Sequence, residues 1–215
     1  MSARMAKVPT FAGNPGRVSV TQSRLRGAGL GSFFRPSQLE GLGIGYDRLQ
    51  SLVAAGGVER VARGLYRLAS AEPTERYSLA AVCAQVPRSI VCLLSALQVH
   101  GIGTQLPREV WLAIPHKARA PRVSGVKVRL LRFSGAAWFY GVSDTDFESV
   151  PARITSPART VVDCFRFERL VGREAAMEAL RDSLRRKKFT IDALYRTLEV
   201  LPSRRLLRVL EATAP

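Results

Sequence analysis

FRPSQLEGLGIGYDRLQSLV, residues 34–53, predicts two short helices separated by a tight glycine turn. Ser37 and Glu40 have the spacing of a capping box, in which the serine hydroxyl accepts from the backbone N–H at Glu40 and the carboxylate reaches back. We therefore expect the first helix to begin at Ser37. Gly43 and Ile44 form the turn, and we expect Ile44 to lie between the two helices.

The second helix of this stretch is amphipathic. Its apolar residues recur at helical spacing, which leaves polar side chains on the other face. Gly56 and Gly57 end the helix, because glycine adopts the left-handed conformation without steric cost. The apolar positions are Tyr46, Leu49, Leu52 and Val53, although Tyr46 is equally placed to contact a phosphate.

A basic hairpin follows the second helix. Residues 58–61 and 65–68 are strand-like, and Ala62-Arg63-Gly64 supplies the turn between them. Helix, turn, helix and basic hairpin together predict a winged helix-turn-helix, with Phe33 and Phe34 as core residues beneath it.

In a winged helix-turn-helix, the second helix enters the major groove of DNA. Arg48 is suited to guanine O6 and N7, and Gln50 to adenine N6 and N7. A winged helix that contacts only proteins is the alternative. The predicted DNA-binding residues are Tyr46, Asp47, Arg48, Gln50 and Ser51 at the bases, Ser37 and Gln38 at phosphates, and Arg60, Arg63 and Arg67 on the wing.

The charge of the chain agrees with a nucleic-acid partner. The 215 residues contain 33 Lys and Arg against 17 Asp and Glu, a net charge of +16, and residues 1–70 hold ten basic and three acidic side chains. Such an imbalance favours a polyanion. A generally basic proteome is the alternative explanation.

Composition shifts divide the chain into three parts. Residues 1–17 lack periodicity and form a basic arm, which is suited to phosphates or a minor groove or is simply a solvated tail. Residues 18–70 form the winged domain, with its first helix over 18–30. Ala69 to Glu75 is a small, polar linker around Pro73, so residues 71–215 form a second domain.

The pattern of residues 71–215 predicts a mixed α+β domain with a small antiparallel or mixed sheet and a helical C-terminus. Ser156-Pro157 is a strong helix start, with serine at the cap and proline at the first helical position. The other expected helices are 77–85, 90–99 capped by Ser89, 173–187, 191–201 capped by Thr190, and a last one from Pro202 or Ser203 to about 212; the expected strands are 109–114, 126–132, 140–142, 148–150 and 153–155.

The sequence offers little to catalysis, and we expect no enzyme, cofactor or metal. His100 and His116 lack a nucleophile or acid companion in sequence, and Asp144-Thr145-Asp146 is expected to be a turn-forming loop. Cys83, Cys92 and Cys164 lack metal-ligand spacing and are expected to be small core residues in a reducing cytoplasm. No apolar run reaches transmembrane length, so we expect a cytoplasmic protein without membrane contact.

Two basic runs occur late in the chain. Arg185-Arg186-Lys187-Lys188 stands at a helix end, where cations stabilise the helix dipole. Arg204 and Arg205, with Arg208, stand at the start of the last helix. The first run has this structural role, or the two runs together form a second polyanion-binding surface.

Several motifs, in this order, resemble the AbiEi antitoxin family of type IV toxin–antitoxin systems. The resemblance extends over about residues 18–210. Its motifs are the opening stretch ending in Gly64-Leu65-Tyr66-Arg67-Leu68, then Leu94-Ser95-Ala96-Leu97 with His100-Gly101-Ile102, the strand 110–115 ending in Pro115, and Arg159-Thr160-Val161-Val162-Asp163. Gly45 departs from the family, whose members commonly have a Ser or Thr cap there.

The resemblance implies a DNA-binding antitoxin that binds repeats in its own promoter and represses the operon. Its second domain would neutralise a nucleotidyltransferase-like toxin without a demonstrated tight complex. Arg159 and Asp163 have i, i+4 spacing, which predicts an ion pair within one helix; a role of this pair in antitoxin action is the alternative. A solitary winged-helix regulator, or a nuclease or transferase with a catalytic second domain, are the alternatives for the whole chain.

Overall fold

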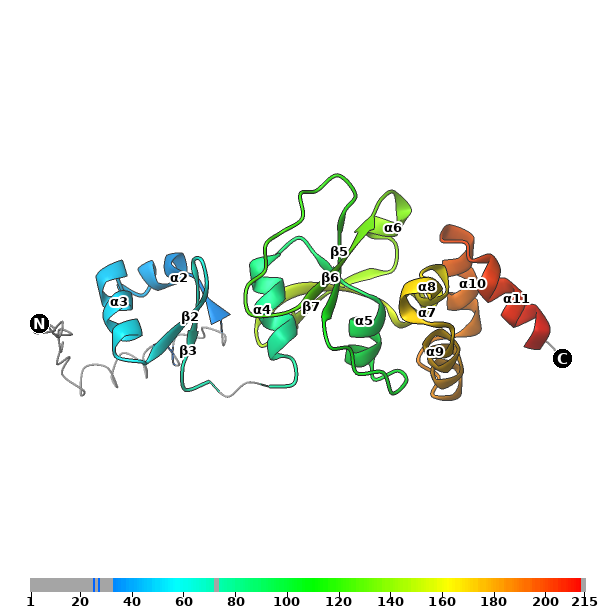
Figure 1. Cartoon of the computed structure of the whole chain (residues 1–215), viewed down its shortest axis with the longest axis horizontal. Coiled ribbons are helices and arrows are strands. Elements are labelled where there is room, and N and C mark those ends of the chain that lie inside the picture. The colour runs from blue at the N-terminus through cyan, green and yellow to red at the C-terminus, as the bar shows by residue number, and fades with distance from the viewer. Residues whose placement is uncertain (1–24, 26, 28–32, 72–73, 214–215) are drawn as a thin grey trace, which may run out of the picture. The chain divides into compact units, whose positions relative to one another are not determined.

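The computed structural model describes residues 25, 27, 33–71 and 74–213. The chain divides into two compact units, Met1–Glu72 and Pro73–Pro215, hereafter the N-terminal and C-terminal units. Both are drawn in Figure 1. The expected arm over 1–17 lies outside the described residues, as does the expected helix over 18–30 except for Leu25, which is fully buried, and Gly27.

Within residues 33–71, the N-terminal unit combines two helices with a small antiparallel sheet whose strand order is β1-β3-β2. Its core contains Leu39, Ile44, Leu49 and Leu52, so the predicted turn residue Ile44 does lie beneath the helices. The elements are β1 (Phe33–Phe34), α2 (Pro36–Glu40), α3 (Tyr46–Ala54), β2 (Val58–Ala62) and β3 (Leu65–Leu68).

Helix α2 begins one residue earlier than expected. Pro36 occupies the first helical position and Arg35 precedes it as the N-cap. The backbone N–H of Arg35 donates to Gln38 Oε1 at 2.8 Å, so Gln38 takes the part that we assigned to Glu40. The Ser37 cap was wrong because the fixed φ of proline favours the first helical position, and Ser37 falls inside the first turn.

Helix α3 starts after Gly45, which supplies no side-chain cap. Leu49 and Leu52 point into the core, whereas Tyr46 is 62% exposed. Tyr46 is therefore a surface residue, and of its two interpretations the core position is wrong. The helix ends at Ala54, and Gly56 follows with φ +70°.

Phe33 and Phe34 are buried, as expected, and they also form a strand. Phe33 is opposite Arg67 and Phe34 is opposite Tyr66 on β3. This pairing makes β3 the central strand of the sheet.

The C-terminal unit contains a five-stranded mixed sheet of order β6-β5-β4-β8-β7. Strands β5 and β6 are parallel, as are β4 and β8. Its strands are β4 (Ile90–Val91), β5 (Val110–Pro115), β6 (Val128–Phe133), β7 (Val142–Phe147) and β8 (Val150–Thr155); its helices are α4 (Tyr77–Gln85), α5 (Leu93–His100), α6 (Ala136–Phe139), α7 (Pro157–Arg166), α8 (Glu168–Val171), α9 (Arg173–Arg185), α10 (Ile191–Val200) and α11 (Arg204–Thr213).

The sheet of this unit lies between helices. Helix α4 covers one side, and α5 with α7 covers the other, where α9, α10 and α11 gather around α7 (Figure 1). On β5, Trp111 and Ala113 belong to the core shared with α5 and α7. Since side chains alternate along a strand, Leu112 turns to the opposite face, where α4 lies.

Residues 90–91 were wrongly assigned to a helix capped by Ser89. Val91 pairs with Leu112 on one side and with Ile154 on the other, so these two residues form the central strand β4. A run that is apolar all round does not distinguish a buried strand from a buried helix. Helix α5 begins only at Leu93.

Asp144-Thr145-Asp146 was also misassigned, because it belongs to β7 rather than to a loop. Asp144 pairs with Arg153 on β8, and the turn instead falls at Glu148 and Ser149, both with positive φ. The polarity of the segment follows from its place on an edge strand of the sheet.

Candidate nucleic-acid interface

Helix α3 presents a polar face outside the core of the N-terminal unit. Asp47, Gln50 and Ser51 are exposed together with Tyr46, and Arg48 is half-buried. Ser51 Oγ donates to the Asp47 carbonyl at 2.9 Å, so part of its hydrogen-bonding capacity is used within the helix. Burial of Leu49 and Leu52 fixes the rotation of α3 and thereby the direction of this face.

The start of α2 adds two exposed polar side chains, Ser37 and Gln38. Because Gln38 Oε1 accepts from the backbone of Arg35, the side-chain amide of Gln38 is held in one orientation. Its NH₂ group can donate to an anion, as can the Ser37 hydroxyl.

The hairpin carries two exposed arginines, Arg60 on β2 and Arg63 in the turn before Gly64. Gly64 has φ +67°, a conformation that the turn requires and that glycine adopts without strain. Arg60 and Arg63 therefore stand where we expected them, on the surface of the hairpin.

Arg67, the third expected wing contact, is only 6% exposed. Its guanidinium donates to the Ala71 carbonyl and lies 3.8 Å from Glu59 Oε2. The expectation that Arg67 lies on the surface was wrong. Strand β1 pairs with β3, so β3 has a neighbouring strand on each side, and Arg67 is covered at the centre of the sheet. The signal for this was the Phe33-Phe34 pair, whose strand character we did not predict.

The first late basic run serves the structure of the C-terminal unit. Lys188 Nζ donates to the His100 carbonyl at 2.8 Å, and Arg186 donates to the Gly101 carbonyl at 2.6 Å. These cations satisfy carbonyls at the C-terminal end of α5, where positive charge is stabilised. Arg185 pairs with Asp182 at 2.7 Å, whereas Lys187 is exposed.

The second run lies elsewhere on the unit. Arg204 and Arg205 are exposed and line a cavity of about 320 Å³ together with Arg166 and Ser203. Arg185 and Arg186 line a different cavity. The two basic runs therefore line different cavities.

Arg159 and Asp163 form the predicted ion pair within α7. Nε of Arg159 lies 2.6 Å from Asp163 Oδ2, both side chains are fully buried, and Arg166 adds a second contact to Asp163 at 2.8 Å. Arg159 also donates to the carbonyls of Tyr140 and Ala137. Burial raises the pKa of Asp163, and the two guanidinium groups oppose that rise.

His100 is half-buried and the three cysteines are buried in the C-terminal unit. Nε2 of His100 lies 2.7 Å from the Thr155 carbonyl, and burial lowers the pKa of His100. Cys83, Cys92 and Cys164 are buried, and burial raises the pKa of each thiol, for Cys83 to about 12. His116 is exposed at the end of β5.

Within the described residues, no three side chains of the His, Cys, Asp or Glu type are grouped as a metal site would require. Among the helices of that same part of the chain, none is long and apolar enough to cross a membrane.

The N-terminal unit thus pairs an exposed polar helix face with a hairpin that carries two exposed arginines. Residues 28–69 match the family model described as "Transcriptional regulator, AbiEi antitoxin". The match confirms the predicted resemblance for this segment, which includes α2, α3 and the hairpin. No curated protein matches the chain significantly.

Proposed function

We propose that the N-terminal unit is a winged helix-turn-helix that binds double-stranded DNA, and that the protein is an antitoxin-type transcriptional autorepressor. The observation that carries this proposal is the exposed polar face of α3, on a helix whose other face is anchored by Leu49 and Leu52. The family match over residues 28–69 supports it independently.

In this proposal α3 lies in the major groove. Gln50 pairs with an adenine and Arg48 with a guanine, each contact discriminating against a wrong base by about 1–3 kcal/mol. Tyr46, Asp47 and Ser51 line the same groove. Ser37 and Gln38 at α2 hold phosphates, and Arg60 and Arg63 reach the backbone or the minor groove.

The hairpin strengthens the assignment because two of its three exposed side chains, Arg60 and Arg63, are cationic, the third being Glu59. Each lysine or arginine that neutralises a phosphate releases counterions, which makes binding salt-dependent. Five of the ten basic residues in 1–70 lie before residue 33, and five lie in the described range 33–71. The helix face supplies the specificity of this interface, and the arginines supply much of its affinity.

We assign toxin neutralisation to residues 71–215, with a nucleotidyltransferase-like toxin encoded beside this gene as the functional partner. The family that matches residues 28–69 is described as an antitoxin, which supports an antitoxin role for the protein; the assignment to residues 71–215 rests on the resemblance of their motifs. Autorepression then follows if the operator repeats lie in the promoter of the same operon.

The DNA proposal is tested by fluorescence anisotropy with the full chain and a duplex from upstream of its own gene. We expect Gln50→Ala combined with Arg60→Ala and Arg63→Ala to weaken binding by at least roughly tenfold, since three contacts are lost. Arg119→Ala with Arg122→Ala, which removes two exposed arginines of the C-terminal unit, is the matched control. Equal affinity of the triple variant and the wild type would overturn the proposal.

The antitoxin assignment is tested by co-expression with the neighbouring nucleotidyltransferase gene. Wild type and the DNA-binding triple variant are both expected to restore growth, because neutralisation is assigned to the other unit. If the wild type does not relieve the growth arrest, the protein is a solitary regulator and not an antitoxin.

A further inference from the structure

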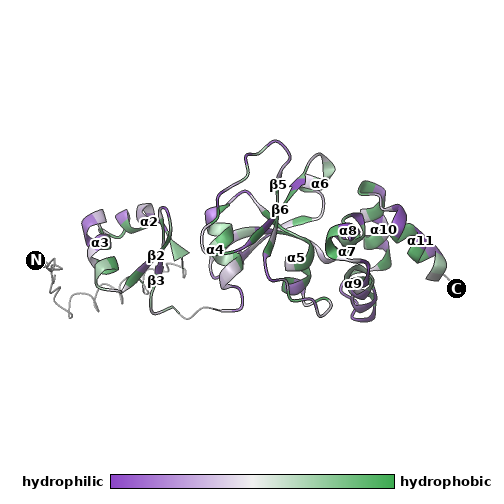
Figure 2. Ribbon diagram, in the orientation of Figure 1, coloured by the Kyte–Doolittle hydropathy of each residue, from purple (hydrophilic) through white to green (hydrophobic). Residues whose placement is uncertain are grey.

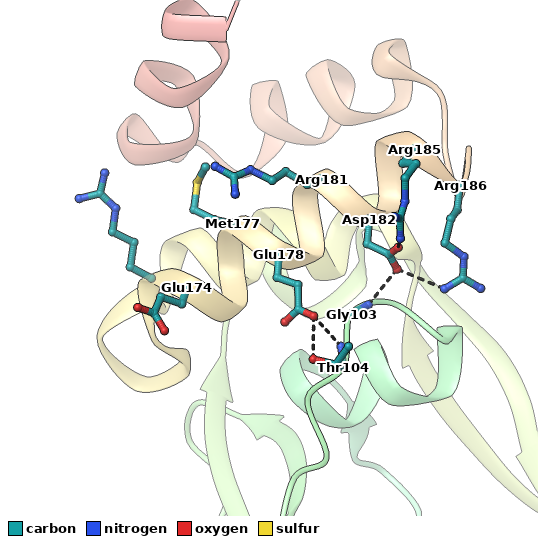
Figure 3. A pocket seen from close by; sticks show the side chains of 10 residues that line it. Gly103, Thr104, Glu174, Met177, Glu178, Arg181, Asp182, Arg185 and Arg186 are labelled. Atoms are coloured by element: carbon teal, nitrogen blue, oxygen red, sulfur yellow. Dashed lines mark hydrogen bonds and ion pairs between the residues drawn. The ribbon is translucent and has the colours of Figure 1, made fainter.

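Helix α9 carries two chemically different edges. Glu174, Glu178 and Asp182 recur every four residues along one edge. Arg173, Met177, Arg181 and Arg185 recur with the same spacing along the other, which we call the basic edge. Residues from both edges line a cavity of about 780 Å³ together with Gly103 and Thr104 (Figure 3).

The acidic edge is engaged by the loop after α5. Glu178 accepts from the Thr104 backbone at 2.9 Å and from its hydroxyl at 2.7 Å, and Asp182 accepts from the Gly103 backbone at 3.0 Å. Figure 3 shows both carboxylates pointing toward this loop. Hydrogen bonds from Thr104 and Gln105 lower the pKa of Glu178, and the Gly103 N–H, with Arg185 and Arg186, lowers that of Asp182 to about 2. Glu178 and Asp182 are thus ionised and already hydrogen-bonded to the loop after α5.

Of the basic edge, only Arg185 is engaged among the described residues of the unit, through its ion pair with Asp182. Arg173 and Arg181 are exposed and form no ion pair within the part of the chain that the structure describes. Met177 lies between them in sequence and is half-buried, with its thioether at the edge of the core. Figure 2 draws α9 mainly in hydrophilic colours, in contrast to the apolar helix α5.

We propose that the basic edge of α9 docks an acidic amphipathic helix of a partner protein. The argument is charge complementarity with a defined spacing. Arg173 and Arg181 are eight residues apart, about 12 Å along the axis at 1.5 Å per residue. A helix with two carboxylates eight positions apart presents its charges at the same separation, and an apolar residue midway between them faces Met177.

The same residues disfavour a nucleic-acid ligand. Glu174 adds a negative charge to the cavity lining, and Met177 places an apolar side chain midway between the arginines. Glu174 repels both kinds of anion, so the discrimination rests on Met177: an apolar side chain of a helix packs against it, whereas a phosphate chain gains nothing from it. This docking surface is independent of the proposed DNA interface, which uses other residues in the other unit.

The test follows the Nε–Hε resonances of the arginines by NMR in the full chain. The probe is an alanine-rich helical peptide of about 20 residues, long enough to be helical in water, carrying Glu, Leu and Glu at successive fourth positions. We expect the resonances of Arg173 and Arg181 to move at up to millimolar peptide, while that of Arg122, on the loop after β5, does not. A peptide with both Glu residues changed to Gln is expected to bind at least roughly tenfold more weakly.

A charge exchange sharpens this test. Arg173→Glu with Arg181→Glu removes the two reporting side chains, so binding to this variant is followed by the backbone amide resonances of α9. The variant is expected to lose binding of the acidic peptide and to bind a peptide with Lys at both positions; unchanged thermal unfolding shows that it is folded. Shifts absent at millimolar acidic peptide would overturn the proposal. So would a single-stranded oligonucleotide that moves the same resonances when the peptide does not. DNA binding by this variant stays at the wild-type level, which separates the outcome from that of the proposed function.

Discussion

Gly141 and Arg159 approach each other so closely that no side chain fits between them. A Cβ atom added at Gly141 would lie 2.9 Å from Arg159 Cβ, and Gly141 has φ +62°. The Tyr140 carbonyl, immediately before this glycine, accepts from Arg159 at 2.5 Å. The turn before β7 is therefore shaped around one buried guanidinium.

Gly141→Ala is expected to destabilise the protein by roughly 2–4 kcal/mol, because it combines a strained φ with overpacking against Arg159. The matched control is Gly125→Ala, which has φ +77° but nothing within 4 Å of the added Cβ. The control carries the backbone strain alone and is expected to cost about 1 kcal/mol. Urea unfolding of both variants measures the difference, and equal losses would mean that the close approach contributes nothing.

Removal of Asp163 leaves the guanidinium of Arg159 buried without its carboxylate. Since breaking a buried ion pair costs about 3–5 kcal/mol, Asp163→Ala is expected to unfold at a much lower temperature than the wild type. The double variant Arg159→Met with Asp163→Leu buries no charge at these two positions, and we expect it to lose less than Asp163→Ala. Calorimetry of the wild type and the two variants measures their unfolding temperatures. A double variant at least as unstable as the single one would show that the pair stabilises the fold beyond mutual neutralisation.

The Asp182 contacts predict a pH dependence of stability. The folded pKa of Asp182 is about 2, below its ordinary value of 3.8, so the folded state favours the ionised carboxylate. This contribution is complete above the ordinary pKa and is lost as the pH falls from about 4 to about 2. Asp182→Asn is therefore expected to be less stable than wild type at neutral pH, with a difference that narrows across that interval. Urea unfolding of the variant and the wild type from neutral pH down to about pH 2 measures this difference, and a difference that stays constant over the interval would contradict the prediction.

Gln50 and Arg63 are expected to affect DNA binding in different ways. Gln50→Ala should weaken binding to the cognate duplex by about 1–3 kcal/mol and leave binding to unrelated DNA nearly unchanged, because Gln50 is assigned to a base. Arg63→Ala should weaken both and reduce the slope of log affinity against log salt by roughly 0.9, because Arg63 is assigned to a phosphate. Anisotropy titrations at several salt concentrations measure both quantities. Identical behaviour of the two variants would contradict the assigned roles.

Local signals predicted much of the fold. The amphipathic helix over 46–54, the hairpin with its turn at Gly64, and the helix start at Ser156-Pro157 all appear in the structure. The Thr190 cap is present as well, accepting from the Ala193 N–H at 3.2 Å. Each of these features depends on residues within a few positions of one another, so the local sequence specifies it independently of how the rest of the chain folds.

Position within a sheet was not predictable in the same way. Ile90 and Val91 form a strand because β5 and β8 pair with them from both sides, and Asp144 joins β7 because β8 lies beside it. Arg186 and Lys188 meet the end of α5, more than 80 residues earlier in the chain. Such contacts are fixed by pairing partners distant in sequence, which periodicity does not reveal.

The sequence by itself determined that Arg60, Arg63 and Arg67 stand on a basic hairpin beside a helix with a polar face. Only the tertiary structure decided that Arg60 and Arg63 are exposed while Arg67 is covered. The physical reason is the pairing of Phe33 and Phe34 with β3, which places that strand in the middle of its sheet and leaves β2 at the edge.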